Sequence, residues 1–364
     1  MSYRPFARGS SPVGVRTLEL SDETRESRPL TIEIWYPADA RFLGQDLDPA
    51  TADHFTSAPG LPEAVQHAVR DAAPAVGTFP LLLTSHAAAS HRRDGAFAAT
   101  HLASHGYVVA APDHSGDTQA DLIGDALAAD TGAPPRRLPD EEICVHRPLD
   151  VLFTLDHLLS GADAELAALI DPERIGMYGV SLGGWTTLTT NALDRRLKAS
   201  LVAAPSYGTH GPFPQTAMQT SLLRLDWGRP VPTFVIAGEC DSLVVLSDLR
   251  ELYDRLQPPK RFAVLSRASH FHWAENGEEL YEQVRPMWES GLIQNAGADL
   301  AALASIPFSA LCPNRHATDT LKALCLAHMD THLKGSAAAR AYLDKDVPGS
   351  FTDRGIGLET VSTG

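Results

Sequence analysis

A serine flanked by glycines is the strongest candidate for chemistry in this chain. The run GVSLGG, residues 179–184, follows a short apolar segment and opens a helical pattern. This setting is typical of a tight strand–turn–helix junction in which a strained backbone pushes the serine Oγ out of the sheet. Side chains two residues before and after the serine would collide, and glycine stands at both positions. We predict that Ser181 is a nucleophile and that the N–H of Leu182, at the start of the helix, donates to an oxyanion.

A serine nucleophile needs a base, and the base needs a group that orients it. Asp241 follows the predicted strand 233–237 in the run GECD, so it lies at the carboxyl end of a strand. Glu239 is the alternative orienting residue, but its earlier position in the turn favours a place on the rim of the site. We therefore predict that Asp241 orients the base.

The base is predicted from the segment that follows strand 262–265. This segment reads SRASHFHW, and His270 directly follows its small polar turn. His272 is the competing candidate, two residues further on and between aromatic side chains. With His270 as the base, the order along the chain is serine, aspartate, histidine, which is the order expected of an α/β-hydrolase.

A mostly parallel sheet is required to position these residues. Short apolar runs rich in β-branched residues alternate with helical patterns, which predicts an α/β fold with helices on both faces of the sheet. Eight strands are predicted, at 13–20, 30–36, 79–84, 107–111, 175–180, 199–203, 233–237 and 262–265. The first two are expected to form an antiparallel hairpin at one edge. Helices are predicted at 93–105, 144–159, 182–193, 247–256 and 318–333.

The segments between these elements read as surface insertions. Segment 38–78 is rich in Pro, Ala, Asp and Gly, and so is segment 116–143. The stretches 206–230 and 274–316 are candidates for a small lid or rim over the site. Neither a repeat nor a linker divides the sequence. We expect a single α/β-hydrolase domain over residues 1–364, with insertions at about 116–143, 206–230 and 274–316.

Composition and charge narrow the class of partner. The chain is 44% hydrophobic and carries a net charge of −15, which argues against a nucleic-acid or anionic-membrane partner. The N-terminus lacks the apolar stretch of a signal peptide, and no segment approaches the about 18 apolar residues of a membrane span. The four cysteines lack metal-type spacing, so we expect a reduced, cytoplasmic protein, with a Cys312–Cys325 disulfide as the less favoured alternative. His328 and His332 have the spacing of a metal pair but no third ligand, so no metal site is predicted.

Several stretches of the sequence together resemble a known family. They are PVGVRTLEL, LTIEIWYPAD, SHAAAS, GYVVAAPDHSGDT, RPLDVLFTLDHLL and IGMYGVSLGGW. They look like the predicted dienelactone-hydrolase group of the α/β-hydrolase superfamily, which is related to platelet-activating-factor acetylhydrolases and cutinase-like esterases. The resemblance covers about Pro12 to His272, with weaker support at 318–333. It implies a serine esterase without cofactor or metal. Ser181 stands where true dienelactone hydrolases have cysteine, so a dienelactone substrate is not expected.

The resemblance also implies a role for the SHAAAS loop, residues 85–90. In the relatives this loop reads His-Gly-x-Gly, and an N–H just past the His-Gly pair donates to the oxyanion. Here His86 matches the histidine, Ala87 the glycine and Ala88 the donor. The methyl groups of Ala87 and Ala89 must then be accommodated, and a positive φ at Ala87 would be strained. A small-residue turn without a catalytic role is the alternative, and His86 is expected to buttress the loop.

Together these residues predict hydrolysis of a small or medium ester through an acyl-enzyme. Ser181 attacks the carbonyl, His270 takes the serine proton, and Asp241 orients the imidazole. The N–H groups of Ala88 and Leu182 stabilise the oxyanion. The side chains expected to line an apolar pocket, each of which could equally belong to the core, are Trp185, Tyr207, Phe271 and Trp273, with Phe213 and Trp227 as further candidates. An amide or peptide hydrolase using the same residues and a non-catalytic binding protein on this scaffold are the alternatives.

Overall fold

Two compact units make up the chain in the computed structural model, which describes residues 3–128, 134–290 and 298–363. The N-terminal unit comprises Ala7–Tyr178 and Leu193–Leu197. The C-terminal unit comprises Met1–Phe6, Gly179–Ala192 and Lys198–Gly364. That the two units form a single domain stays a prediction.

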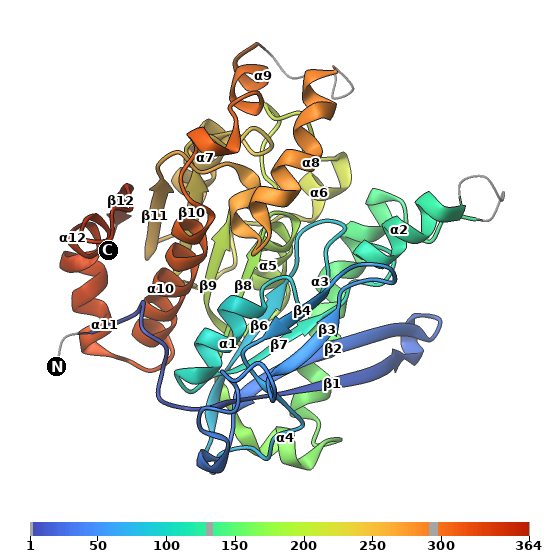
Figure 1. Cartoon of the computed structure of the whole chain (residues 1–364), viewed down its shortest axis with the longest axis vertical. Helices are drawn as coiled ribbons and strands as arrows, with labels where there is room; N and C mark the ends of the chain where they lie inside the picture. Colours follow the sequence, from blue (N-terminus) through green and yellow to red (C-terminus); the bar gives the residue numbers. More distant parts are fainter. Residues whose placement is uncertain (1–2, 129–133, 291–297, 364) are drawn as a thin grey trace. The chain divides into compact units, whose positions relative to one another are not determined.

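The strands of the N-terminal unit follow the order β8-β6-β7-β2-β1-β5 (Figure 1). Their bounds are β1 Val13–Asp22, β2 Arg28–Pro37, β5 Val69–Arg70, β6 Phe79–Ser85, β7 Val108–Pro112 and β8 Ile170–Val180. β6 and β7 are parallel, and β1 and β2 form the predicted antiparallel hairpin. The hairpin was predicted at the edge, but the short strand β5 pairs with β1 outside it. Two residues give no sequence pattern that could reveal such a strand.

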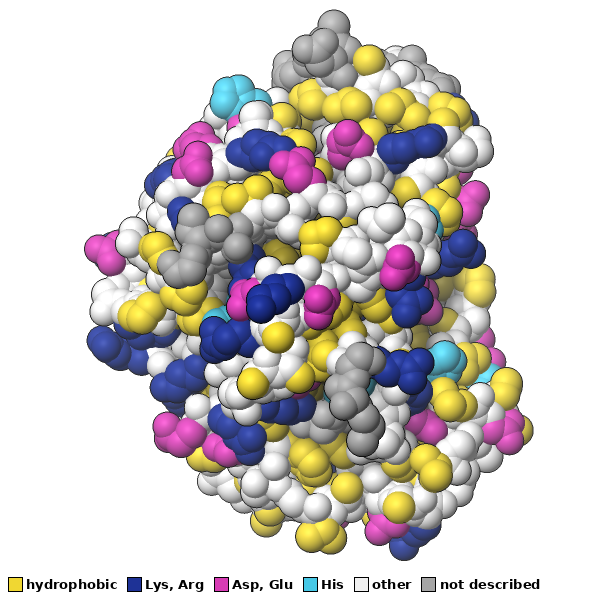
Figure 2. Space-filling model, turned by 90° about the vertical axis from the view of Figure 1, so that its left-hand side faces the viewer, with side chains coloured by type: hydrophobic (Ala, Val, Ile, Leu, Met, Phe, Trp, Pro, Cys, Tyr) yellow, Lys and Arg dark blue, Asp and Glu magenta, His cyan; other side chains and the backbone are white. Residues whose placement is uncertain are grey.

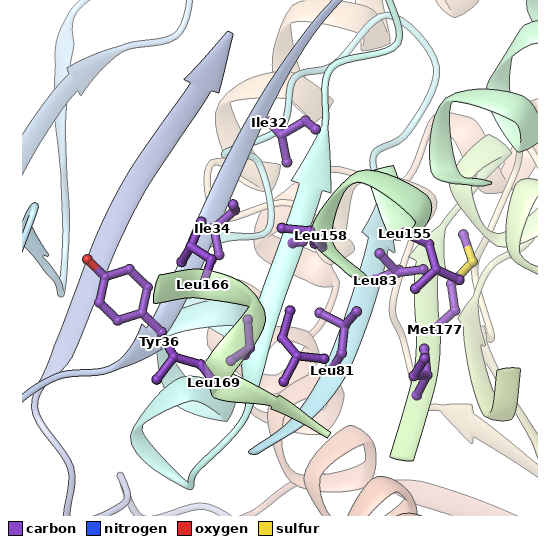
Figure 3. Close-up of a cluster of buried hydrophobic side chains, with 14 of the residues drawn as sticks. Ile32, Ile34, Tyr36, Leu81, Leu83, Leu155, Leu158, Leu166, Leu169 and Met177 are labelled. Carbon is purple, nitrogen blue, oxygen red and sulfur yellow. The ribbon is translucent and has the colours of Figure 1, made fainter. Parts of the chain in front are cut away.

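The core of this unit lies between the sheet and two helices, α3 (Asp140–Leu159) and α4 (Ala164–Leu169). Figure 3 shows alternate residues of β2 and β6 on the same side as the leucines of these helices. They are Ile32, Ile34, Tyr36, Leu81 and Leu83 on the strands, with Leu155, Leu158, Leu166 and Leu169 on the helices. Side chains alternate between the faces of a strand, so one face of each strand supplies a continuous apolar layer. Helix α1 (Ala96–Ser104) also packs against β2 and β7.

The strands of the C-terminal unit follow the order β12-β11-β10-β9. Their bounds are β9 Leu197–Ala203, β10 Thr233–Gly238, β11 Lys260–Leu265 and β12 Leu358–Thr363. The first three in sequence are parallel, and β12 is antiparallel to β11. Helix α7 (Leu246–Arg255) packs on β10 and β11 and buries Leu249, Leu252 and Tyr253. The remaining helices of this unit are α5 Leu182–Leu193, α6 Ala217–Leu222, α8 Gly277–Glu289, α9 Ala298–Ala304, α10 Asn314–His332, α11 Ala337–Ala341 and α12 Val347–Thr352.

The predicted insertions contain regular structure that the sequence pattern did not reveal. Segment 38–78 holds the hairpin of β3 (Asp53–Thr56) and β4 (Glu63–Gln66), which is a separate sheet, as well as β5. Segment 116–143 holds α2 (Gln119–Ala128), which buries none of its residues. Segment 206–230 holds α6, and 274–316 holds α8 and α9. Residues 129–133 and 291–297 of these insertions lie outside the described residues.

Three further features bear on the predicted class of protein. All four cysteines are free thiols, so the alternative of a Cys312–Cys325 disulfide is wrong. Within the described ranges, no helix is long and apolar enough to cross a membrane. On the face shown in Figure 2, acidic and basic side chains are mixed with hydrophobic ones.

Candidate active site

Ser181 occupies a sharp turn between β8 and α5. Its φ of +55° lies in the left-handed region, which residues other than glycine rarely adopt. A Cβ at Gly179 would lie 2.3 Å from the carbonyl oxygen of Gly183, so only glycine fits two residues before the serine. The backbone N–H of Ser181 donates to Ala203 O at 2.9 Å, and its carbonyl accepts from Ser206 N–H at 2.9 Å. The strained turn is therefore held by backbone hydrogen bonds on both sides.

A hydrogen-bonded chain runs from Ser181 to His270 and Asp241. His270 Nε2 lies 2.9 Å from Ser181 Oγ, and His270 Nδ1 lies 2.8 Å from Asp241 Oδ2. A carboxylate can only accept, so Nδ1 carries the proton and Nε2 is free to take the serine proton. The second oxygen of Asp241 accepts from the N–H groups of Leu243 and Val244, at 2.9 and 2.8 Å. Asp241 is 2% exposed, which fixes both its position and its orientation.

The two turns that carry Asp241 and His270 are joined by backbone contacts. β10 and β11 are parallel with Gly238 opposite Leu265, so both strands end at the same edge. Beyond them, Cys240 N–H donates to Ala268 O at 2.9 Å. A Cβ at Gly238 would lie 2.5 Å from the same carbonyl, so glycine allows this close approach. The sheet thus brings together two residues that are 29 positions apart in sequence.

The structure gives Glu239 and His272 other partners. The Glu239 carboxylate accepts from the backbone N–H of Arg267 at 2.8 Å, and so anchors the turn before His270. Arg267 has a φ of +57°, which explains why this turn needs an anchor. His272 is fully buried and bonds to Ser269 and to Cys312 O rather than to Ser181.

The two predicted oxyanion donors belong to different units. Leu182 N–H is at the first residue of the 12-residue helix α5, where no acceptor is available within the helix. Within the described residues, the N–H groups of Leu182 and Ala88 donate to no other group. Ala88 is exposed in a turn closed by Ser90 N–H on Ala87 O at 3.3 Å. Their joint action on one oxyanion stays a prediction.

The positive φ of the SHAAAS loop falls on Ala89, at +50°, and not on Ala87. Ala89 N–H donates to Asp117 Oδ1 at 3.0 Å. Asp117 in turn accepts from Arg147 at 2.5 Å, and Arg147 also donates to His86 O. Arg147 is fully buried. A buried ion pair therefore holds the loop in a conformation that glycine would adopt more readily.

His86 fits the expected role of a buttress. Its Nδ1 donates to Ala87 O at 2.7 Å, and its Nε2 accepts from the backbone N–H of His114 at 3.1 Å. Burial and the charge of Arg147 hold the pKa of His86 well below its ordinary value. Both ring nitrogens of a neutral His86 are thus used within the N-terminal unit.

A second Ser–His–Asp chain lies in the N-terminal unit, and the sequence analysis missed it. Ser85 Oγ lies 2.9 Å from His114 Nε2, and His114 Nδ1 lies 3.0 Å from Asp150 Oδ2. All three side chains are buried, with exposures of 1%, 0% and 0%. Asp150 also accepts from Arg28 at 2.8 Å. The signal that could have found this chain was present, because the stretches PDHSGDT and RPLD contain His114, Asp117, Arg147 and Asp150.

Electrostatics distinguishes this buried chain from an acid–base site. Burial, with the nearby Arg147 charge, lowers the pKa of His114 to about 4. Burial alone would raise the pKa of Asp150, but hydrogen bonds from His114 and Arg28 hold it below its ordinary value. At neutral pH His114 is therefore a neutral, weakly basic imidazole between an ionised carboxylate and a hydroxyl.

The predicted pocket residues differ in burial and in their contacts. Trp185 is 0% exposed and its indole N–H donates to Gln219 O at 3.3 Å, and its contact with substrate stays a prediction. Trp273 is 2% exposed, and its contact with substrate also stays a prediction. Tyr207 is 7% exposed and its hydroxyl contacts Glu251 and Arg255, while Phe271 is partly buried beside His270. Of the two further candidates, Trp227 is buried and Phe213 is 67% exposed.

No group of three or more potential ligands that could hold a metal occurs in residues 3–128, 134–290 and 298–363. His328 and His332 lie with ring centroids 4.7 Å apart, and His328 Nε2 donates to Pro232 O at 3.1 Å. Burial lowers the pKa of His328 to about 3. This pair has the contacts of core histidines.

Comparison with known proteins places the fold. No family model and no curated protein matches the chain. Among solved structures, the chain is similar to a ferulic acid esterase from Streptomyces cinnamoneus, with a TM-score of 0.62 and 22% identity. The match covers 89% of this chain and 91% of that one. The chain has a mixed α/β fold with mostly parallel strands and helices, as the α/β-hydrolase fold does.

Proposed function

We propose that this protein is a serine carboxylic-ester hydrolase with Ser181, His270 and Asp241 as its catalytic triad. The observation that carries the proposal is the hydrogen-bonded chain of these residues, 2.9 and 2.8 Å long at its two links, on a serine with φ +55°. A serine Oγ on a strained turn, an unprotonated Nε2 beside it and a buried acid behind it are the parts that nucleophilic acyl transfer needs.

The proposed reaction has two steps. Ser181 Oγ attacks the ester carbonyl while His270 Nε2 takes its proton, and the alcohol leaves with that proton. Water then attacks the acyl-enzyme, with His270 again as the base, and the acid is released. The Leu182 N–H, at the N-terminus of α5, is a donor to the oxyanion, and the Ala88 N–H is proposed as the second. Each donor of this kind contributes about 3 kcal/mol in other enzymes.

Small or medium carboxylic esters are the proposed substrates. The similar solved structure is a ferulic acid esterase, which supports an ester rather than an amide and makes feruloyl esters worth including in a panel. Membership of the predicted dienelactone-hydrolase group, with its implied lack of cofactor or metal, belongs to the same proposal. A cytoplasmic location is also proposed, and four free thiols support it.

The proposal is tested with an active-site label and a substrate panel. A fluorophosphonate should label the protein stoichiometrically, and mass spectrometry should locate the adduct on Ser181. p-Nitrophenyl esters of graded acyl length and methyl ferulate measure turnover, and matched anilides measure amide hydrolysis. Faster turnover of the esters supports the proposal, and faster turnover of the anilides indicates a peptidase or amidase. If the protein is not labelled and turns over no substrate, both enzymatic functions are overturned.

A further inference from the structure

We propose that His272 is a positioning residue that holds His270 in line with Ser181, by clamping the catalytic turn to the insertion at 274–316. This inference rests on the proposed function of Ser181, His270 and Asp241. His272 itself touches neither Ser181 nor Asp241 through a hydrogen bond within the described residues. Its hydrogen bonds are to Ser269 and Cys312.

The first contact ties His272 to the residue before the catalytic histidine. His270–Trp273 form a single turn of 3₁₀ helix capped by Ser269. His272 Nδ1 accepts from the Ser269 backbone N–H at 3.1 Å and lies 2.8 Å from Ser269 Oγ. The Ser269 side chain accepts in return from the backbone N–H of His272. This reciprocal cap closes the turn around His270 and sets the direction in which its side chain leaves the backbone.

The second contact ties the same ring to the insertion. His272 Nε2 lies 2.8 Å from Cys312 O, and a carbonyl oxygen can only accept. The proton is therefore on Nε2, which leaves Nδ1 as the acceptor that the Ser269 N–H requires. Two backbone groups on different segments thus select one neutral tautomer. Burial lowers the pKa of His272, which favours the same neutral form.

Aromatic packing holds the ring in this plane. Phe308, in the insertion, stacks on His272 with centroids 4.5 Å apart and planes at 14°. Tyr281 of α8 contacts Phe308 and Phe271 edge-on, at 5.6 and 6.1 Å. The Tyr281 hydroxyl donates to Ile306 O at 2.5 Å. Phe308 therefore packs directly on the imidazole, and Tyr281, from the first half of the insertion, supports Phe308.

The C-terminal end of the insertion is also bonded to the turn before His270, and the two ends of the insertion are bonded to each other. Cys312 N–H donates to Arg267 O at 2.9 Å, and the Arg267 guanidinium donates to Ala310 O. The side-chain amide of Asn314 donates to the carbonyls of Ala274 and Glu275, both at 3.0 Å. The His272 side chain adds a further connection between the turn and the insertion, through Ser269 and Cys312. Loss of its hydrogen bonds should let the turn relax and shift His270 Nε2 relative to Ser181 Oγ.

The test compares three variants of His272 with a matched control. His272→Phe keeps an aromatic ring for Phe308 but removes the hydrogen bonds of the ring to Ser269 and Cys312. His272→Asn retains an acceptor near Ser269, and His272→Gln retains a donor that can reach Cys312 O. His328→Phe is the control, since His328 is also buried in the C-terminal unit, donates to a carbonyl and contacts a phenylalanine.

His272→Phe should lower kcat by about 10- to 100-fold, as loss of an orienting contact does elsewhere, with little change in KM. His272→Asn or His272→Gln should recover part of that loss. His328→Phe should lower the melting temperature and leave kcat unchanged. If His272→Phe and His328→Phe change kcat to the same extent, or if His272→Phe leaves kcat as in the wild type, the proposal is overturned.

A second measurement does not depend on turnover. The proton of His270 Nδ1 that is shared with Asp241 should give a low-field NMR resonance in the wild type. The resonance should broaden or disappear in His272→Phe and persist in His328→Phe. Its persistence in His272→Phe would overturn the positioning role even if the protein hydrolyses esters. If the resonance is lost in His272→Phe and kept in His328→Phe, but the wild-type protein hydrolyses no ester, only the proposed function is contradicted.

Discussion

Two Ser–His–Asp chains occur among the described residues, and their hydrogen bonds are nearly the same length. Ser181–His270–Asp241 has links of 2.9 and 2.8 Å, and Ser85–His114–Asp150 has links of 2.9 and 3.0 Å. Their surroundings differ. Ser181 sits at φ +55° at the start of α5, whereas Ser85 is the last residue of β6 and is 1% exposed. Hydrogen-bond geometry alone therefore does not define a nucleophile.

The charges around the two chains favour the proposed catalytic role of Ser181–His270–Asp241 over Ser85–His114–Asp150. Neutral backbone N–H groups hold the free oxygen of Asp241, whereas Arg28 and Arg25 neutralise Asp150. Arg147 also donates to Ser85 Oγ, at 3.3 Å. With its pKa lowered to about 4, His114 is too weak a base to accept a proton efficiently at neutral pH. We infer that the Ser85 chain has a structural role. It is connected to the SHAAAS loop through Arg147, which donates to both Ser85 Oγ and His86 O.

Exchanging the two serines for alanine should give the largest difference. Ser181→Ala should lower kcat on p-nitrophenyl butyrate by about 10⁴- to 10⁶-fold, as in other serine hydrolases. Ser85→Ala should leave kcat of the same order but cost about 1–3 kcal/mol in the free energy of unfolding, because Arg147 and His114 lose a buried partner. Kinetics and urea denaturation of both variants measure this. Loss of turnover in a folded Ser85→Ala protein would reverse the assignment.

The two aspartates should separate activity from stability in the same way. Asp241→Asn should lower kcat by about 10⁴-fold through the wrong tautomer of His270, with the fold retained. Asp150→Asn should cost about 3–5 kcal/mol, because it leaves buried Arg28 without its charged partner. Calorimetry and the turnover of the folded fraction distinguish the two effects. An Asp150→Asn protein as stable as the wild type would contradict the structural role of the Ser85–His114–Asp150 chain.

The buried chain should also contribute to acid sensitivity. The pKa of His114 is about 4 in the folded state and about 6.5 unfolded, so unfolding takes up a proton between these values. Its contribution to stability is present above pH 6.5 and is lost as the pH falls towards 4, by about 3 kcal/mol. His114→Gln should reduce the slope of unfolding free energy against pH in this window by up to about 1.4 kcal/mol per unit.

His210 provides the control of opposite sign. A hydrogen bond to Asp248 raises the pKa of this exposed histidine above its ordinary value. Its contribution is present at low pH and is lost as the pH rises through the raised pKa, so His210→Gln should steepen the loss of stability on acidification. Urea denaturation at several pH values measures both slopes. An unchanged slope in His114→Gln would show that His114 is not buried in its neutral form.

The smallest effect is expected at the strained alanine of the loop. Ala89, at φ +50°, adopts a conformation that costs an ordinary residue about 1–2 kcal/mol. Ala89→Gly should therefore stabilise the protein by up to about 1 kcal/mol after the added freedom of the unfolded chain is subtracted. Ala87→Gly is the control and should destabilise slightly, since Ala87 has no positive φ to relieve. A change of melting temperature in the opposite order would contradict the loop conformation.

The sequence alone determined the alternating strands and helices, because buried strands and amphipathic helices carry their own periodicity. Each of the eight predicted strands has a counterpart in β1, β2 or β6–β11, and the prediction of helix 182–193 is confirmed. The elements that it missed include β12 and α2. β12 exists because β11 offers it a partner, and α2 buries no residue.

The sequence also named Ser181, Asp241 and His270, because strand ends and small turns are local features. Only the tertiary structure decided between Glu239 and Asp241 and between His270 and His272, since the choice depends on which side chain reaches which across the joined turns of β10 and β11. The same holds for Ser85, His114 and Asp150, which lie far apart in sequence and meet only when β6 and α3 pack in one core. A local stretch of sequence shows which residue types are present, but the pairing and packing of the strands set the distances between their side chains.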